Sequence, residues 1–163
     1  MPTSVQQQLA DRLRADRAVW REMVAAVGPD RFDEPGPMGE WSFGDLAGHL
    51  LGWRERSIAR LEAAARGERD TPAPWPADLD DDDAVNDWIH ERDRGRSAQE
   101  LVDTYDASFE RLAVAIEAIP PEVVDRAASL PWLEGRPLSD LDPTGHFHDE
   151  HEGSLRAWLA ENG

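Results

Sequence analysis

The sequence predicts an all-α protein: a four-helix bundle with long loops between the second and third helices and between the third and fourth. Apolar residues recur every three or four positions in four long segments, which is the spacing of one face of an α-helix. Residues that cap helices stand at the start of several of these segments. Proline, glycine and aspartate are concentrated between them, as is typical of irregular connections.

Size and composition narrow the function classes. A chain of 163 residues suits one domain with a real hydrophobic core, so we expect 1–163 to form a single domain. The net charge of -17 disfavours nucleic-acid and anionic-membrane partners, because their phosphates would be repelled. The chain has no cysteine, which excludes disulfides and thiolate ligands. Without a signal-like or membrane-spanning apolar run, a cytoplasmic protein is expected.

The first half of the chain should contain two long helices. Apolar spacing predicts the first over residues 4–27, where a Gly-Pro pair ends the pattern. Residues 30–40 contain several prolines and glycines and should form a loop. The second helix is expected over 41–66, because Ser42 and Asp45 have the spacing of a capping box.

The second half should contain a short helix and a third long one before the last. Residues 68–83 are rich in proline and aspartate and are expected to be irregular. A short helix is expected over 84–92. The third long helix begins with a capping box at Ser97 and ends before the Pro-Pro pair that follows Ile119. Residues 130–141 should form a second loop.

The last helix carries an unusual concentration of histidine. We expect Asp142 to cap it and Pro143 to occupy its first position, where the missing amide hydrogen does no harm. Residues three, four and seven apart share a helix face, so His148, His151 and Leu155 form one stripe. Two imidazoles therefore continue a stripe that is otherwise apolar.

A third histidine lies on the apolar face of the second helix. His49 stands there with Leu50 and Trp53. A single histidine on such a face is usually a satisfied core residue, but several buried together need a partner for every ring nitrogen. We therefore expect His49, His148 and His151 to hold a divalent metal, zinc first and nickel or manganese as alternatives.

The ligand set within the last helix has alternatives. His148 with Glu152 and His146 with Glu150 have four-residue spacing. The preferred choice of His148 and His151 leaves Glu152 or Glu150 to move protons or to replace a ligand. The direction of His146 is not fixed by its position at the start of the helix.

A ligand pocket is expected beside this site. Trp41 and Trp53 are candidates for its walls, although a single tryptophan is more often a core residue. Gly44, Gly48 and Gly52 recur every four residues. They either make room for a ligand or allow close packing against a neighbouring helix, and the two interpretations are compatible.

These motifs resemble a known superfamily. The segment 41–53 resembles the tryptophan-serine, aspartate, histidine, tryptophan signature of helix two in the DinB-like (DinB/YfiT) four-helix superfamily. Residues 85–89, the capping box at Ser97 and the segment 148–151 lie in the order seen in its ClbS/DfsB branch. The superfamily also includes the metal-binding domain of mycothiol-dependent maleylpyruvate isomerases, and the bacillithiol transferases.

The resemblance implies a bundle that is often a homodimer and that binds a divalent metal through one histidine of helix two and two ligands of the last helix. His49 matches the first position. Relatives commonly space the last pair by four, whereas His148 and His151 are three apart and Phe147 stands four before His151. The ClbS-like branch also implies action on reactive small molecules without the complete triad.

The leading functional hypothesis is a metal-dependent enzyme of detoxification or stress response, either a thiol-dependent transferase or a hydrolase. It would use a low-molecular-weight thiol such as mycothiol, or water, to attack an electrophilic small molecule. The alternative is a non-catalytic protein that binds or sequesters a small molecule. A third reading is a purely structural bundle whose histidines satisfy one another.

Overall fold

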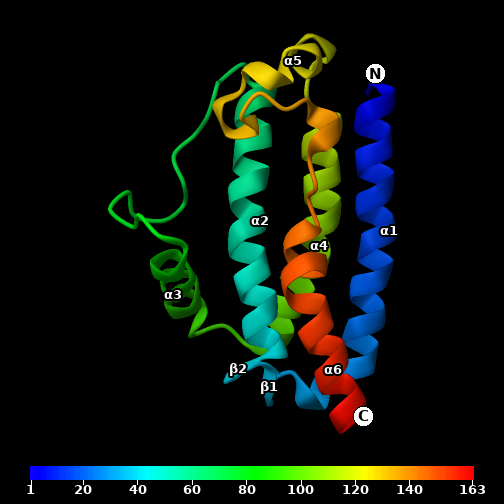
Figure 1. The fold of residues 1–163 in the computed structure, drawn as a ribbon, viewed down its shortest axis with the longest axis vertical. Helices are drawn as coiled ribbons and strands as arrows, with labels where there is room; N and C mark the ends of the chain where they lie inside the picture. Colours follow the sequence, from blue (N-terminus) through cyan, green and yellow to red (C-terminus); the bar gives the residue numbers. More distant parts are fainter.

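A computed structural model describes residues 1–163 and confirms the all-α fold. Four helical segments run side by side, and a shorter helix lies outside them against the second (Figure 1). The four segments are α1 (Ser4–Val27), α2 (Phe43–Ala65), α4 (Ala98–Glu117), and the π-helical turn η5 (His146–His151) continued by α6 (Glu152–Asn162); the outer helix is α3 (Asp82–Asp93). None of these helices combines the length and the apolar character needed to cross a membrane.

Side-chain caps start the first three long helices. The capping box predicted for α2 is confirmed: Ser42 accepts a hydrogen bond from the amide of Asp45, and the Asp45 carboxylate accepts one from the amide of Ser42. At α4, Ser97 accepts a hydrogen bond from the amide of Glu100. These bonds satisfy amides that have no partner inside the helix, which is why the sequence indicates these starts closely.

An aromatic cluster ties the four segments together at the centre of the core. Trp20 of α1 is fully buried and stacks on Phe43 of α2, with ring centroids 4.9 Å apart. Its ring also meets Tyr105 of α4 at 4.6 Å and Phe147 of η5 at 5.8 Å, both edge to face. Each of the four segments therefore contributes one ring to a single packed unit.

The segment before α2 differs from the predicted loop. Strand β1 (Pro35–Met38) pairs antiparallel with β2 (Trp41–Ser42), so α2 begins at Phe43, after the hairpin. The turn uses Gly39 at φ 64°, a left-handed conformation that glycine adopts without strain. The hairpin lies at the ends of α2 and α6 (Figure 1) and places Trp41 there.

The last helical segment also departs from the prediction. Asp142 does not cap a helix, because its carboxylate is bound by Arg12 of α1 at 2.7 Å. The helix begins after Pro143, without a side-chain cap, as the π-helical turn η5. At the end of this turn the amide of Glu152 donates to the carbonyl of Phe147, five residues back rather than four.

The two long connections differ in regularity. No helix or strand occurs between α2 and α3. The connection from α4 to η5 contains α5 (Pro121–Asp125) and three single 3₁₀ turns, which are Ala127–Ser129, Pro131–Leu133 and Leu138–Asp140. Pro121 occupies the first position of α5, where its fixed φ favours a helix start.

The glycine row of α2 serves close packing. A side chain at Gly52 would meet Ile89 of α3 at 2.6 Å, and one at Gly44 would meet Ala98 of α4 at 2.5 Å. At Gly48 the nearest atom belongs to the Asp93 carboxylate, at 2.9 Å. The row therefore lets α3 and the start of α4 approach the α2 backbone.

Candidate metal centre

Three histidines from two helical segments converge at one point. The Nε2 atom of His146 lies 3.0 Å from Nε2 of His49 and 3.1 Å from Nε2 of His151. Ligand atoms of all three residues lie within 4.8 Å of one another. Ligands placed tetrahedrally around zinc at ordinary Zn–N lengths would be about 3.3 Å apart. The three imidazoles are therefore nearly in the arrangement that a metal with nitrogen ligands requires.

The π-helical turn brings the two histidines of η5 together. His146 and His151 are five residues apart, and a π-turn repeats its direction after about that interval. In a regular α-helix the partners would be three or four residues apart. The extra residue of the turn leaves Phe147 facing the core, where it is buried against Trp20.

The environment keeps these imidazoles neutral. Burial, followed by repulsion from His146 and His151, lowers the pKa of His49 to about 3. Burial is also the largest cause that lowers the pKa of His146 and of His151; the Glu150 carboxylate opposes both shifts. Neutral imidazole is the form that binds a metal, because its unprotonated nitrogen offers a lone pair.

Hydrogen bonds within the protein do not satisfy the cluster. A neutral imidazole carries one N–H group, and Nδ1 of the buried His49 has no partner. The Nε2 atom of His146 lies within hydrogen-bonding distance of three groups, namely His49, His151 and the Glu150 carboxylate at 3.1 Å. A single ring nitrogen cannot form a hydrogen bond with all three. A metal among the three Nε2 atoms would use lone pairs that the protein leaves unpaired, so the donor set fits a metal such as zinc.

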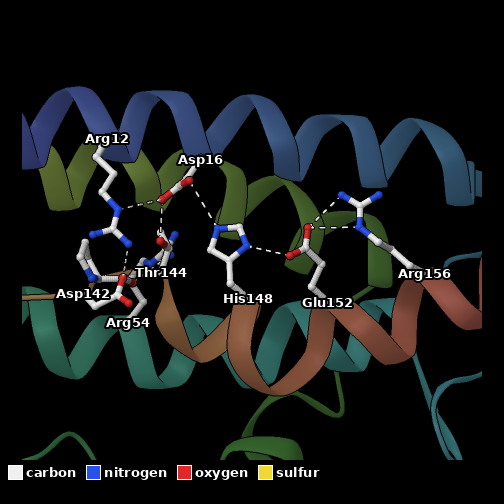
Figure 2. Close-up of polar contacts among 9 residues, drawn as sticks. Arg12, Asp16, Arg54, Asp142, Thr144, His148, Glu152 and Arg156 are labelled. Carbon is white, nitrogen blue, oxygen red and sulfur yellow. Dashed lines mark hydrogen bonds and ion pairs between the residues drawn. The ribbon is translucent and has the colours of Figure 1, made fainter.

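His148, the third ligand expected from the sequence, lies elsewhere. It sits between Asp16 of α1, with Nε2 3.4 Å from the carboxylate, and Glu152, with Nδ1 at 2.9 Å (Figure 2). Thr144 donates a hydrogen bond to Asp16, and Arg156 pairs with Glu152 at 2.9 Å. Burial alone would lower the pKa of His148, but Glu152 and Asp16 outweigh it and raise that pKa. His148 therefore links η5 to α1.

The two glutamates expected to move protons have different surroundings. Glu150 lines the cleft in front of the histidines and is mostly exposed, with its carboxylate beside His146. Glu152 is engaged by His148 and Arg156 on the side of α1. Of the two, Glu150 is the carboxylate placed to act on a ligand at the histidine cluster.

A cleft of about 850 Å³ opens onto the three histidines, and both tryptophans expected as pocket walls line it. The Trp53 indole donates to the side chain of Asn86 of α3 at 2.8 Å. Trp41 stacks on His90, with centroids 4.6 Å apart and an interplanar angle of 8°. The outer helix α3 thus holds one wall of the cleft.

The polar lining of this cleft is acidic. Its ionisable side chains, apart from histidine, are all carboxylates, and no lysine or arginine is among them: Glu40, Asp82, Asp83, Asp87 and Glu150. A cleft of this sign favours cationic or neutral groups and repels anions.

Sequence reasoning missed Arg54, which faces the other side of the histidine cluster. It continues the buried stripe of Ala47, Leu51 and Ile58, at the spacing of a core-facing helix position. An arginine within an apolar stripe is unusual, and this pattern could have identified Arg54 as a candidate functional residue.

The comparison with family models gives one match. The family described as the mycothiol maleylpyruvate isomerase N-terminal domain matches residues 13–149. The chain belongs to this family. The family is DinB-like, which confirms the resemblance at the superfamily level, whereas the ClbS/DfsB branch stays a prediction. The match includes His49 and His146 and ends just before His151. No curated protein and no solved structure matches the chain.

Proposed function

We propose that this member of the mycothiol maleylpyruvate isomerase N-terminal domain family is a metal-dependent enzyme that attacks an electrophilic small molecule with a thiol or with water. His49, His146 and His151 would hold the ion. The observation that carries the proposal is the convergence of their three Nε2 atoms on the inner end of a large cleft. A zinc-like ion with three protein ligands supplies an open position and lowers the pKa of a thiol or water bound there.

The thiol in this proposal comes from outside the chain. The protein has no cysteine, so its own side chains supply no sulfur nucleophile. The family description points to mycothiol as the first thiol to test. Zinc is the first metal to test because three neutral imidazoles suit it, with nickel and manganese as alternatives.

The side chains of the cleft then have distinct roles. The Glu150 carboxylate, beside His146, accepts the proton of the incoming nucleophile. Trp41 and Trp53 provide flat apolar walls that position the electrophile. Of the three ligands His49 is the most buried, at 6% exposed, whereas the side chain of His146 is 30% exposed and open to the cleft.

Metal analysis of untagged protein tests the ligand set. Wild type should carry about one ion per chain, and His49→Ala, His146→Ala and His151→Ala should each lose it, because a three-ligand site does not hold zinc tightly with two. His148→Ala is the matched control: it removes an imidazole of the same turn and should keep the metal. Elemental mass spectrometry after dialysis measures all five proteins.

Two results would contradict the proposal. Retention of metal by His146→Ala together with its loss from His148→Ala would restore the ligand set expected from the sequence. Failure of the wild type to bind zinc, nickel or manganese would remove the metalloenzyme. A protein that binds a small molecule without turnover would then be the better account of the cleft.

A further inference from the structure

Arg54 is a buried cation without a salt bridge, although the Asp16 carboxylate is near enough to oppose the lowering of its pKa by burial. Only 5% of its surface is exposed, and no carboxylate lies within 4.0 Å of its guanidinium, so it forms no salt bridge. Arg56, two residues further along α2, is by contrast paired with Asp70 at 3.6 Å. Burying an unpaired charge is costly, so the position of Arg54 requires an explanation.

The contacts of Arg54 are neutral. The guanidinium carbon lies 4.4 Å from the ring centroid of Tyr105 and 4.1 Å from that of Phe109. Its terminal nitrogens donate to the hydroxyl of Ser108 at 3.2 Å and, more weakly, to the carbonyl of Pro143 at 3.5 Å. Of the five N–H groups of a guanidinium, three therefore have no acceptor in the protein. Burial lowers the pKa of Arg54, which reflects the cost of the charge there.

Arg54 lines a groove of about 260 Å³ that also contacts the histidine cluster. Ser57 and Tyr105 line it as well, and Trp53 and His146 line both this groove and the acidic cleft. The groove thus lies beside the proposed metal centre, across Trp53 and His146 from the cleft.

The charge of the groove is opposite to that of the cleft. Arg56 and Arg60 line it together with Arg54; both pair with Asp70, so Arg54 is the arginine of the groove that has no salt bridge. Its one carboxylate, Asp142, is already paired with Arg12 at 2.7 Å. In a chain of net charge -17, this is a local concentration of positive charge.

We propose that this groove is an anion subsite in which Arg54 binds a carboxylate of the ligand. The planar guanidinium fork matches a carboxylate in size and geometry and binds it through two parallel hydrogen bonds. The anion would supply the direct ion pair that Arg54 lacks within the protein. The acidic cleft would repel the same group, so the ligand is oriented with its carboxylate in the groove.

The role of the subsite in orienting the ligand rests on the proposed function. With its carboxylate held by Arg54, the ligand would place its reacting carbon at the histidine cluster. Anion binding itself needs no metal, so the two proposals can fail separately.

Acetate binding to metal-free protein tests the subsite. Sodium acetate replaces sodium chloride at constant ionic strength in the presence of a chelator, while the indole N–H resonance of Trp53 and the melting temperature are followed. Wild type should show a saturable shift of both. Arg54→Met should bind acetate at least about tenfold more weakly. Arg54→Lys, which keeps the charge but loses the fork, should lie between them.

The stability of the variants separates a binding role from a structural one. Without acetate, Arg54→Met should melt no lower than wild type, because it removes an uncompensated charge and keeps the apolar stem. Arg17→Met is the matched control, since Arg17 is paired with Asp106 away from the groove; it should bind acetate as wild type does. No saturable effect in wild type, or equal acetate affinity in Arg54→Met, would overturn the subsite. Arg54→Lys keeps the test decisive if Arg54→Met fails to fold.

Discussion

The pKa values of two histidines separated by one residue are shifted in opposite directions. His146 packs against other imidazoles, and burial lowers its pKa. His148 lies between Asp16 and Glu152, and these carboxylates raise its pKa above the ordinary value despite partial burial. The surroundings thus favour the neutral, lone-pair form of His146 and favour the protonated form of His148, which links two helical segments. At the scale of the residue, the surroundings of each histidine decide its role: His146 is a candidate metal ligand and His148 is a structural contact.

Glu150→Gln tests the proposed proton acceptor. The variant should retain its metal, because the three imidazoles remain, and should lose about 100-fold or more in turnover of thiol transfer to an electrophile. Steady-state kinetics and metal content measure the two effects. Asp11→Asn, the same loss of charge at an exposed position of α1, is the control and should keep full turnover. Unchanged turnover in Glu150→Gln would remove this residue from the mechanism.

At the scale of the element, α2 meets its neighbours by backbone approach, whereas α1 and α4 are joined by charge at their surface. Gly52 lets Ile89 of α3 lie against the α2 backbone. On the other side of the bundle, Asp106 of α4 accepts hydrogen bonds from Arg17 and Arg21 of α1. The stability of the glycine contacts therefore depends on side-chain volume, and that of the ion pairs depends on pH.

Gly52→Ala should destabilise the protein by about 1–3 kcal/mol, because the added methyl group overlaps Ile89 and forces α3 outward. Since α3 holds Asn86 against Trp53, ligand binding in the cleft should weaken as well. Gly153→Ala is the control: it lies in α6 with no neighbour within 4 Å, and it should stabilise by about 0.5–1 kcal/mol through helix propensity. Denaturant unfolding measures both, and equal effects would contradict the packing role of Gly52.

Asp106→Asn should cost about 1–2 kcal/mol at neutral pH, because it removes charge-assisted hydrogen bonds from the half-buried Arg17. Burial opposes the shift, but the bonds from Arg21 and Arg17 outweigh it and lower the Asp106 pKa from 3.8. A carboxylate with a lowered folded-state pKa contributes its full stability above its unfolded pKa and loses it as pH falls through the folded value. The difference in melting temperature between wild type and variant should therefore be constant from pH 7 to about 5 and shrink below the ordinary value of 3.8. A difference that persists at the lowest pH would rule out this ion pair as its source.

At the scale of the whole molecule, the bundle surrounds the histidine cluster with two openings of opposite charge. The cleft bounded by α3 is lined with carboxylates, and the groove along α2 is lined with arginines. Two of the four long segments, α2 and η5–α6, carry the histidines of the cluster, so an ion bound there would link these two segments. Its effect should therefore reach global stability.

Zinc should raise the melting temperature of wild type, and a chelator should reverse the change. At a free concentration 100 times the dissociation constant, binding to the folded state alone adds about 2.7 kcal/mol, or roughly 5–10 °C for a chain of this size. Thermal unfolding followed by circular dichroism measures the shift. His49→Ala should show none, and an equal shift in this variant would place the zinc elsewhere.

The long helices and most of the candidate residues could be predicted from the sequence, whereas the hairpin and the π-helical turn could not. Capping side chains such as Ser42 and Ser97 determine helix starts locally, so α2 and α4 could be predicted without tertiary contacts. His49, on the apolar face of α2, and Trp41 and Trp53 were likewise expected at the site, and the structure places all three at the cleft. Predictions from helix caps and apolar periodicity hold in the structure because they depend on residues that are neighbours along the chain.

The face that each histidine of the last segment occupies depends on tertiary contacts. Periodicity assumes 3.6 residues per turn, but the π-helical turn adds one residue, so His146 rather than His148 lies with His151. That turn coincides with two distant contacts: Phe147 packs on Trp20 in the core, and His148 is held by Asp16 of α1. The lack of a salt bridge at Arg54 is likewise a property of the assembled bundle. Both depend on residues far apart in the chain, whose proximity no local pattern encodes.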